Sequence, residues 1–354
     1  MPMSGSLAGG GRLRAYLEFI AAVVYFFLAR ALAHRGAQGL ASEQWRPLTE
    51  QGILLFLLVL GYASMGFWLD RQDHPVGAQG LPRRAGWPAE AGMGAAVGWA
   101  LTVACVLSMV AGGGIAIVLV LGPSAWVWLL AEAAFFALAA LAEEVAFRGY
   151  GFQQFEKSVG SLGAALGFAA FYAIVQALIP GSLQLVPGSS HASVAVSVAL
   201  SLVLSTAYLR TRALWVSWGI NFGWKASRAL VFGLAIGGVS SHSPVVQGNP
   251  MRPFWLTGGG YGLDGSWVTF AVLLVALPVV YRLTRELDYR YNAPEIVPGG
   301  IPVDLDAAAR QQHEAATRQA EPASPSLIQI LPVSTPPQAP RPEASPTGQT
   351  PKTN

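Results

Sequence analysis

Two adjacent glutamates and an arginine interrupt a long apolar segment of the sequence. Residues 141–150 read Leu-Ala-Glu-Glu-Val-Ala-Phe-Arg-Gly-Tyr after a nearly uninterrupted apolar run. An ionised side chain in a membrane helix costs roughly 2.5–3.5 kcal/mol on insertion scales, so Glu143, Glu144 and Arg148 need partners or a purpose. Glu144 and Arg148 are spaced i, i+4 and share a helix face, with the acid before the base.

Glu143 points about 100° away from Glu144 and lacks that partner. A carboxylate without a counter-ion in a low-dielectric surrounding is suited to act as a general base. The alternative interpretation is that residues 143–150 are a helix end that reaches the lipid headgroups, where Glu and Arg are ordinary.

Three more polar residues are expected at the depth of the glutamates. The helix of Glu144 and the next one join near residues 158–160, and Gln176 lies about as far after that turn as Glu144 lies before it, roughly 24 Å of helix. Asn221 and Lys225 lie roughly 15 Å and 21 Å along the next helix from the turn near Thr211, measured into the membrane, and they share a helix face. The glutamates, Gln176, Asn221 and Lys225 can therefore meet, either as a functional site or as hydrogen bonds that pack helices.

The elements that carry these residues are predicted to be membrane helices. The chain has 354 residues, of which 53% are hydrophobic and 12% charged, whereas soluble domains carry about 25% charged residues. We predict an all-α integral membrane protein, a bundle of about eight transmembrane helices. The expected spans are 15–33, 51–69, 92–120, 124–147, 161–180, 190–209, 213–236 and 266–284.

Charge and composition set further expectations. The net charge of +3 comes from scattered basic residues, which excludes a nucleic-acid surface. Basic residues concentrate on one side of the predicted spans, so the positive-inside rule places both termini of this multi-pass protein in the cytoplasm. The segment after Arg14 is interpreted as an uncleaved first helix rather than a signal peptide. Cys105 is the only cysteine, so no intrachain disulfide is expected.

The end of the chain differs in composition from the rest. Residues 292–354 are rich in Pro, Ala, Ser, Gln and Thr and cannot bury a core, which predicts a disordered cytoplasmic tail. Its apolar patch at residues 327–331 is interpreted as a chance cluster, with docking on a partner as the alternative.

The motifs resemble those of the CAAX-processing and bacteriocin-processing intramembrane endopeptidases, the CPBP or Abi family. Glu143, Glu144 and Arg148, followed by Gly-Tyr-Gly-Phe, resemble the family's first motif. Residues 208–225 resemble its third motif, and residues 80–84 and 257–265 also fit. The resemblance covers residues 75–285, with a core at 130–230, and leaves residues 1–70 as two additional N-terminal helices.

The resemblance implies an activity and a site. In this family the first glutamate is thought to activate the attacking water, the Glu–Arg pair holds the site, and two histidines with an asparagine bind zinc or support the transition state. This chain departs from that pattern, because Gln176 stands where the second motif has histidine. Asn221 and Lys225 stand where the third motif has His-x-x-x-Asn.

We predict no metal site from this sequence. His34, His74, His242 and His313 fall in predicted loops or the tail, and His191 falls at the outer end of a span. Amide carbonyls are poor zinc ligands beside imidazole, so a tetrahedral zinc site with nitrogen ligands cannot be assembled at this depth. The Lys225 ammonium would instead take the place of a bound cation and neutralise a carboxylate.

Three functional hypotheses follow. Residue chemistry favours a pseudoprotease that binds membrane-associated peptides, such as prenylated CAAX or bacteriocin-like ones, in contact with membrane lipid. The second hypothesis is an active peptidase without histidine, in which Glu143 activates water, Glu144 and Arg148 orient, and Gln176 and Asn221 donate to the oxyanion. The third is a transporter or proton pathway that uses Glu143, Glu144 and Lys225 as relay groups.

Overall fold

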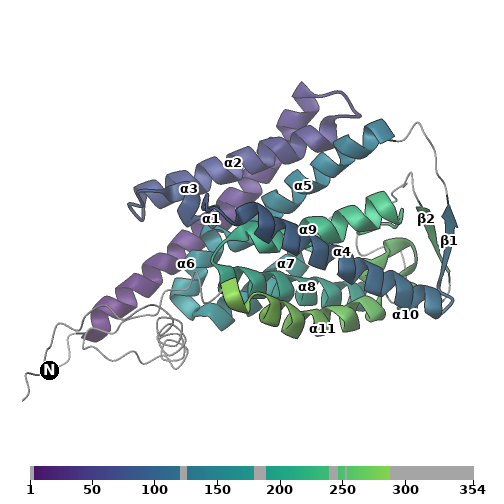
Figure 1. Ribbon diagram of the computed structural model, residues 1–354. Coiled ribbons are helices and arrows are strands. Elements are labelled where there is room, and N and C mark those ends of the chain that lie inside the picture. The colour runs from purple at the N-terminus through teal and green to yellow at the C-terminus, as the bar shows by residue number, and fades with distance from the viewer. Residues whose placement is uncertain (1–3, 120–125, 179–188, 239–245, 252, 288–354) are drawn as a thin grey trace, which may run out of the picture. The chain divides into compact units, whose positions relative to one another are not determined.

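The computed structural model describes residues 4–119, 126–178, 189–238, 246–251 and 253–287 (Figure 1). They all fall within one compact unit that extends to Ala293. The predicted tail at 292–354, its apolar patch at 327–331, and two of the histidines, His242 and His313, lie outside the described residues.

The described part of the chain is mostly helical, and each expected span overlaps a helix. These helices are α1 (Ser4–Leu40), α2 (Arg46–Trp68), α4 (Trp87–Ala111), α5 (Trp126–Arg148), α7 (Ser161–Leu178), α8 (Ser189–Thr211), α9 (Leu214–Ala226) and α11 (Trp267–Leu283). Shorter helices are α3 (Pro75–Ala78), α6 (Tyr150–Val159) and α10 (Phe254–Thr257).

Four of the helices, α1, α2, α4 and α8, are long and apolar enough to cross a membrane, and α7 and α11 contain shorter apolar helices. These properties support a multi-pass integral membrane protein. Eight crossings and two cytoplasmic termini stay predictions.

The expectation of a purely α-helical bundle is wrong at one point. The predicted span 92–120 ends as a helix at Ala111, and β1 (Ile115–Leu119) pairs antiparallel with β2 (Val246–Pro250) at one end of the helices (Figure 1). Gly113 has a φ of +66°, a conformation that glycine adopts without steric cost and that ends the helix. The short apolar run after it is rich in β-branched residues, which favour strands.

The predicted span 213–236 is also shorter than expected. Helix α9 ends at Ala226, and the chain continues as a π-helix, η2 (Ser227–Val231), until it turns at Gly233. Two 3-10 turns, η3 (Gly259–Tyr261) and η4 (Leu263–Gly265), follow α10 in the glycine-rich loop. The π-helix begins two residues after Lys225, and π-helical turns are frequent at functional sites.

Glycines hold the backbones of α4 and α9 in direct contact. A Cβ at Gly94 or Gly98 would lie 2.3 Å and 2.2 Å from a backbone oxygen of α9. A Cβ at Gly219 or Gly223 would lie 2.2 Å from a backbone oxygen of α4. Both helices thus carry small residues at i, i+4, the spacing that lets membrane helices approach closely. This contact fixes α9, the helix that carries Asn221 and Lys225.

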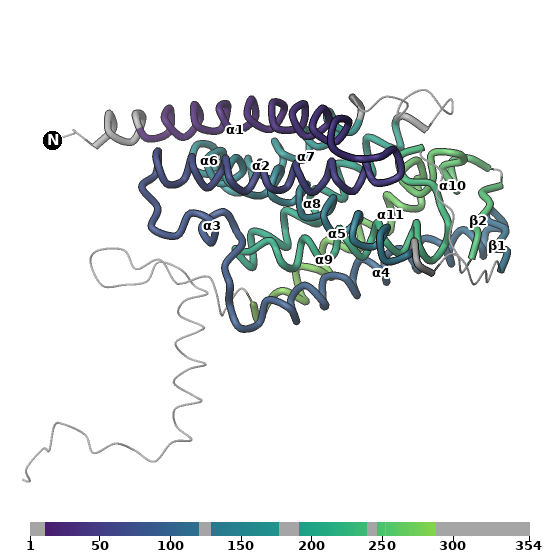
Figure 2. The backbone as a smooth tube through the Cα atoms, turned by 90° about the horizontal axis from the view of Figure 1, so that it is seen from above, coloured from purple at the N-terminus to yellow at the C-terminus, as the bar shows by residue number. Residues whose placement is uncertain are grey.

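The two N-terminal helices lie side by side against the remaining helices (Figure 2). Aromatic rings join α1 to α5 and α5 to α7: the rings of Phe26 on α1 and Phe147 on α5 lie 5.8 Å apart, and that of Phe147 lies 5.0 Å from the ring of Tyr172 on α7. Phe26, Phe147 and Tyr172 are all buried. These rings place side chains of α1 close to the end of α5 that carries the glutamates, and α2 packs on α5 as well.

We predict opposite effects for alanine at two glycines of α4. Gly98→Ala is expected to destabilise the protein by about 1–3 kcal/mol, because the new Cβ would overlap the Ile220 carbonyl oxygen. Gly92→Ala, where a Cβ meets nothing within 4 Å, is expected to raise stability by about 0.5–1 kcal/mol through helix propensity. Thermal unfolding in detergent measures both, and equal melting temperatures for the two variants would contradict the close contact.

Candidate functional site

Glu144 and Arg148 form the predicted ion pair at the end of α5, and it is fully buried. The Arg148 Nη1 atom lies 3.2 Å from the Glu144 Oε1 atom, and both side chains are 0% exposed. Arg148 also donates to the hydroxyl of Ser201 on α8 at 2.9 Å and to its carbonyl oxygen at 3.2 Å. The guanidinium therefore joins α5 to α8.

Glu143 points to α9, where two side chains one turn apart engage its carboxylate. The Lys225 ammonium forms an ion pair with Glu143 Oε1. The Asn221 amide donates to Glu143 Oε2 at 3.1 Å and to Glu144 Oε1 at 3.0 Å. One amide thus bridges both glutamates, which lowers the cost of placing two carboxylates side by side in a low-dielectric interior.

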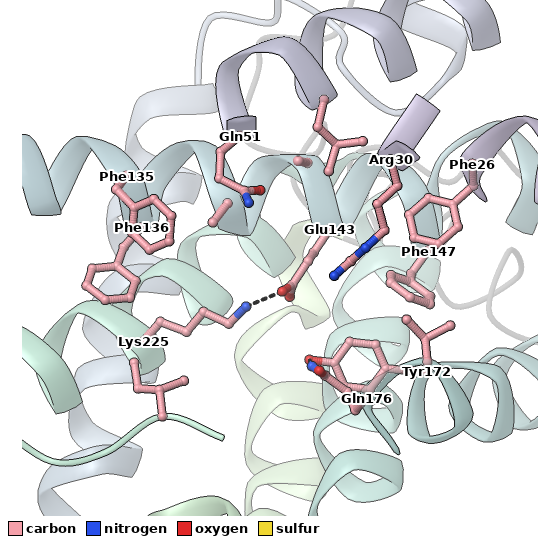
Figure 3. A pocket seen from close by; sticks show the side chains of 15 residues that line it. Phe26, Arg30, Gln51, Phe135, Phe136, Glu143, Phe147, Tyr172, Gln176 and Lys225 are labelled. Atoms are coloured by element: carbon pink, nitrogen blue, oxygen red, sulfur yellow. Dashed lines mark hydrogen bonds and ion pairs between the residues drawn. The ribbon is translucent and has the colours of Figure 1, made fainter. Parts of the chain in front are cut away.

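Gln176 lies beside this cluster but does not bond to either glutamate. Its amide donates to the Tyr172 hydroxyl at 2.9 Å, one turn earlier on α7. Figure 3 shows the Gln176 side chain near Glu143 and Lys225, on the wall of the same cavity. The structure therefore brings the predicted residues together as their depths indicate, while their roles in chemistry stay predictions.

Two cavities, each of about 220 Å³, meet at the Glu143–Lys225 ion pair. Tyr172 and Gln176 line both of them. The first cavity extends to α1 and α2 and has aromatic walls (Figure 3). The second extends to the glycine-rich loop. The ion pair is therefore accessible from two directions.

A second ion pair that the sequence did not predict lines the second cavity. Arg228 of the π-helix lies 2.6 Å from Asp264 of the glycine-rich loop, and the Arg228 side chain is 1% exposed. Asp264 also accepts the backbone N–H of Gly237 at 3.2 Å, and the guanidinium stacks on Trp224 at 4.6 Å. These contacts hold the loop against the segment that follows Lys225.

Arg30 of α1 and Gln51 of α2 are two further polar residues that were not predicted from the sequence, and both line the first cavity. Arg30 interrupts an apolar helix, as the glutamates of α5 do, but it is exposed. A search of the sequence for charged residues within apolar segments would have found Arg30 and Arg228. It would not have shown which residues lie near them.

The described side chains do not fit a zinc ion. Within the described ranges, no group of three or more His, Cys, Asp or Glu residues lies close enough to hold a metal. The carboxylates at the cluster already bind an ammonium and a guanidinium, and the remaining groups are amides. Structural and catalytic zinc sites use imidazole, thiolate and carboxylate ligands. The three described histidines, His34, His74 and His191, line neither cavity.

Comparison with known proteins relates the site to a protease family. Residues 122–227 match the family model described as Type II CAAX prenyl endopeptidase Rce1-like. The match contains both glutamates, Arg148, Gln176, Asn221 and Lys225. It leaves out α1 and α2, with Arg30 and Gln51, and also Asp264. No curated protein and no solved structure is significantly similar to the chain.

We predict that the Glu144–Arg148 pair is required for stability. Arg148→Met is expected to cost about 3–5 kcal/mol, because it leaves a buried carboxylate without its cation. The double variant Glu144→Gln, Arg148→Met is expected to recover at least half of that loss. Chemical or thermal unfolding in detergent measures both.

Arg14→Met is the matched control for this prediction. Arg14 and Glu18 are also spaced i, i+4, but the Arg14 side chain is 62% exposed, and the Glu18 carboxylate, whose side chain is 9% exposed, keeps the Tyr150 hydroxyl as a donor. The loss of Arg14 should therefore change stability by no more than about 1 kcal/mol. A similar small effect for Arg148→Met would mean that the buried pair contributes nothing to the fold.

Proposed function

Residues 122–227 form a domain of the Rce1-like type II CAAX prenyl endopeptidase (CPBP/Abi) family, and on that premise we propose that this chain binds membrane-embedded peptides and has lost hydrolysis. The observation that carries the proposal is the Lys225 ammonium bound to Glu143 where the two cavities meet. In the family this glutamate is the group that would activate water.

A general base must present a free lone pair to the proton that it removes. Each Glu143 oxygen accepts one donor, one from Lys225 and the other from the Asn221 amide. A proton taken from water would weaken the ion pair of Glu143 with Lys225, so the ammonium opposes that transfer. The charge of Lys225 also occupies the place where a metal cation would otherwise stabilise the developing oxyanion.

The binding part of the proposal rests on the first cavity. Phe26, Phe135, Phe136 and Phe147 line it beside the polar cluster. Small-molecule sites typically combine such apolar and aromatic walls with a few convergent polar groups. A peptide with an apolar anchor, such as a prenylated one, suits this combination of walls.

A second candidate function is peptide hydrolysis without histidine. Glu143 favours it, because its side chain is 27% exposed and lines both cavities. In that mechanism Glu143 takes a proton from water, and the oxygen attacks the peptide carbonyl. The carbon–nitrogen bond then breaks as the proton passes to the amine. Asn221 and Gln176 would donate to the oxyanion.

Two measurements on the full chain, purified in a non-ionic detergent, distinguish peptide binding without hydrolysis from peptide hydrolysis without histidine. They are the rate of peptide cleavage and the zinc content of the protein. The probe is a fluorogenic prenylated peptide that ends in a CAAX sequence. We expect no cleavage and no stoichiometric zinc in the wild type. The variant Gln176→His, Asn221→His, Lys225→Asn restores the family's residues and is expected to gain zinc.

Controls decide the interpretation of this experiment. Lys157→Asn removes an exposed lysine outside both cavities and should behave as the wild type. Cleavage by the wild type that Glu143→Gln abolishes would overturn the loss of hydrolysis and establish the second candidate function. Cleavage that survives Glu143→Gln would indicate a contaminating protease.

A further inference from the structure

Arg30 is a cation without a partner in a cavity where the other charges are paired. Its side chain points into the first cavity, on the side of Glu143 away from Lys225 (Figure 3). Within the described part of the chain it makes no hydrogen bond or ion pair. Arg30 is exposed and lies near the end of the predicted span 15–33, about ten residues before α1 ends at Leu40. Its guanidinium is therefore open to a ligand from outside the chain.

The cavity carries an excess positive charge. Among its described lining residues, Arg30, Glu143 and Lys225 are the charged ones, and Glu143 and Lys225 neutralise each other. Arg30 therefore leaves one uncompensated positive charge. An uncompensated cation beside an apolar wall attracts an anion, and the attraction is moderate because Arg30 is exposed.

The groups around Arg30 define the shape of that anion. A guanidinium presents a planar fork of donors that matches a carboxylate in a bidentate manner. The Gln51 amide of α2 lines the same cavity, makes no hydrogen bond within the described chain, and can donate a further one (Figure 3). Phe26 lies one turn before Arg30 on α1 and continues the wall as an apolar surface.

From these observations we infer that Arg30 and Gln51 form a binding site for a carboxylate carried on an apolar, membrane-embedded chain. The carboxylate binds the paired N–H donors of the Arg30 guanidinium, and the apolar chain of the ligand lies along the aromatic wall. This inference deepens the proposed function and rests on it, since it takes the cavity as the place where a membrane-embedded ligand is held. Both residues lie outside the matched family domain, 122–227, so the site is an addition by the N-terminal helices.

Binding of tritiated palmitate to the full chain in a non-ionic detergent tests this site. The wild type is expected to bind palmitate saturably, and Arg30→Gln to weaken binding by at least about tenfold, the effect of losing a charge-assisted bidentate contact. Arg30→Lys, which keeps the charge without the fork, should fall between them. Arg35→Gln removes an exposed arginine of the same helix that does not line the cavity, and should change binding by less than about twofold.

Competitors identify the headgroup and its source. Hexadecanol should displace tritiated palmitate poorly. If hexadecanol displaces it as strongly as unlabelled palmitate does, the carboxylate site is overturned. Stronger displacement by hexadecyl phosphate would also overturn it. Displacement by an N-palmitoylated tripeptide but not by its C-terminal amide would support the site with a peptide terminus as ligand. If neither peptide displaces palmitate, the result supports the site with a fatty acid as ligand.

The outcomes for the two proposals are independent. Equal palmitate binding by the wild type and Arg30→Gln would overturn the carboxylate site and leave the loss of hydrolysis standing. Cleavage of the prenylated peptide by the wild type would overturn the loss of hydrolysis and leave the carboxylate site standing.

Discussion

Two adjacent carboxylates within a mostly apolar helical bundle set the constraint on which the rest of this structure depends. Neither Glu143 nor Glu144 can be held there without donors and cations, because the surroundings supply little solvation. Glu144 is paired within its own helix by Arg148, whereas Glu143 depends on Lys225 of another helix. The Asn221 amide joins the two carboxylates into one network. Helices α5, α8 and α9 are therefore tied together by polar contacts as well as by packing.

The network forms only if α9 is held at a fixed position relative to α5. Glycines at the contact between α4 and α9 hold it there. The contact between α4 and α9 is close enough that backbone oxygens of each helix occupy the space of the other's missing Cβ atoms. Beyond Lys225 the helix changes to a π-turn, and the Arg228–Asp264 pair anchors that turn to the glycine-rich loop. The glycine contact and the Arg228–Asp264 pair together fix the backbone that carries Lys225 close to Glu143.

The comparison with the family gives these contacts a chemical meaning. By the motif resemblance, Gln176 and Asn221 stand at the family's histidine positions, and Lys225 stands at the position of the motif's asparagine. The Glu144–Arg148 pair of the first motif is present and buried. In the proposed function, the replacements at the other positions remove the groups that would hold a metal. The N-terminal helices add Arg30 and Gln51 to the same cavity, from outside the family domain.

The sequence by itself determined the helical class, the location of each long helix and the residues of the central network. It could do so because apolar length, charge within apolar runs and the helical rise are local quantities. It mistook residues 115–119 for helix, since a short apolar run has no periodicity that separates strand from helix. The pairing of Arg228 with Asp264, the approach of Arg30 from α1, and the partner of Gln176 were decided only by the tertiary structure. Each of these depends on which helices become neighbours and at what rotation, and that is set by the packing of residues far apart in the chain.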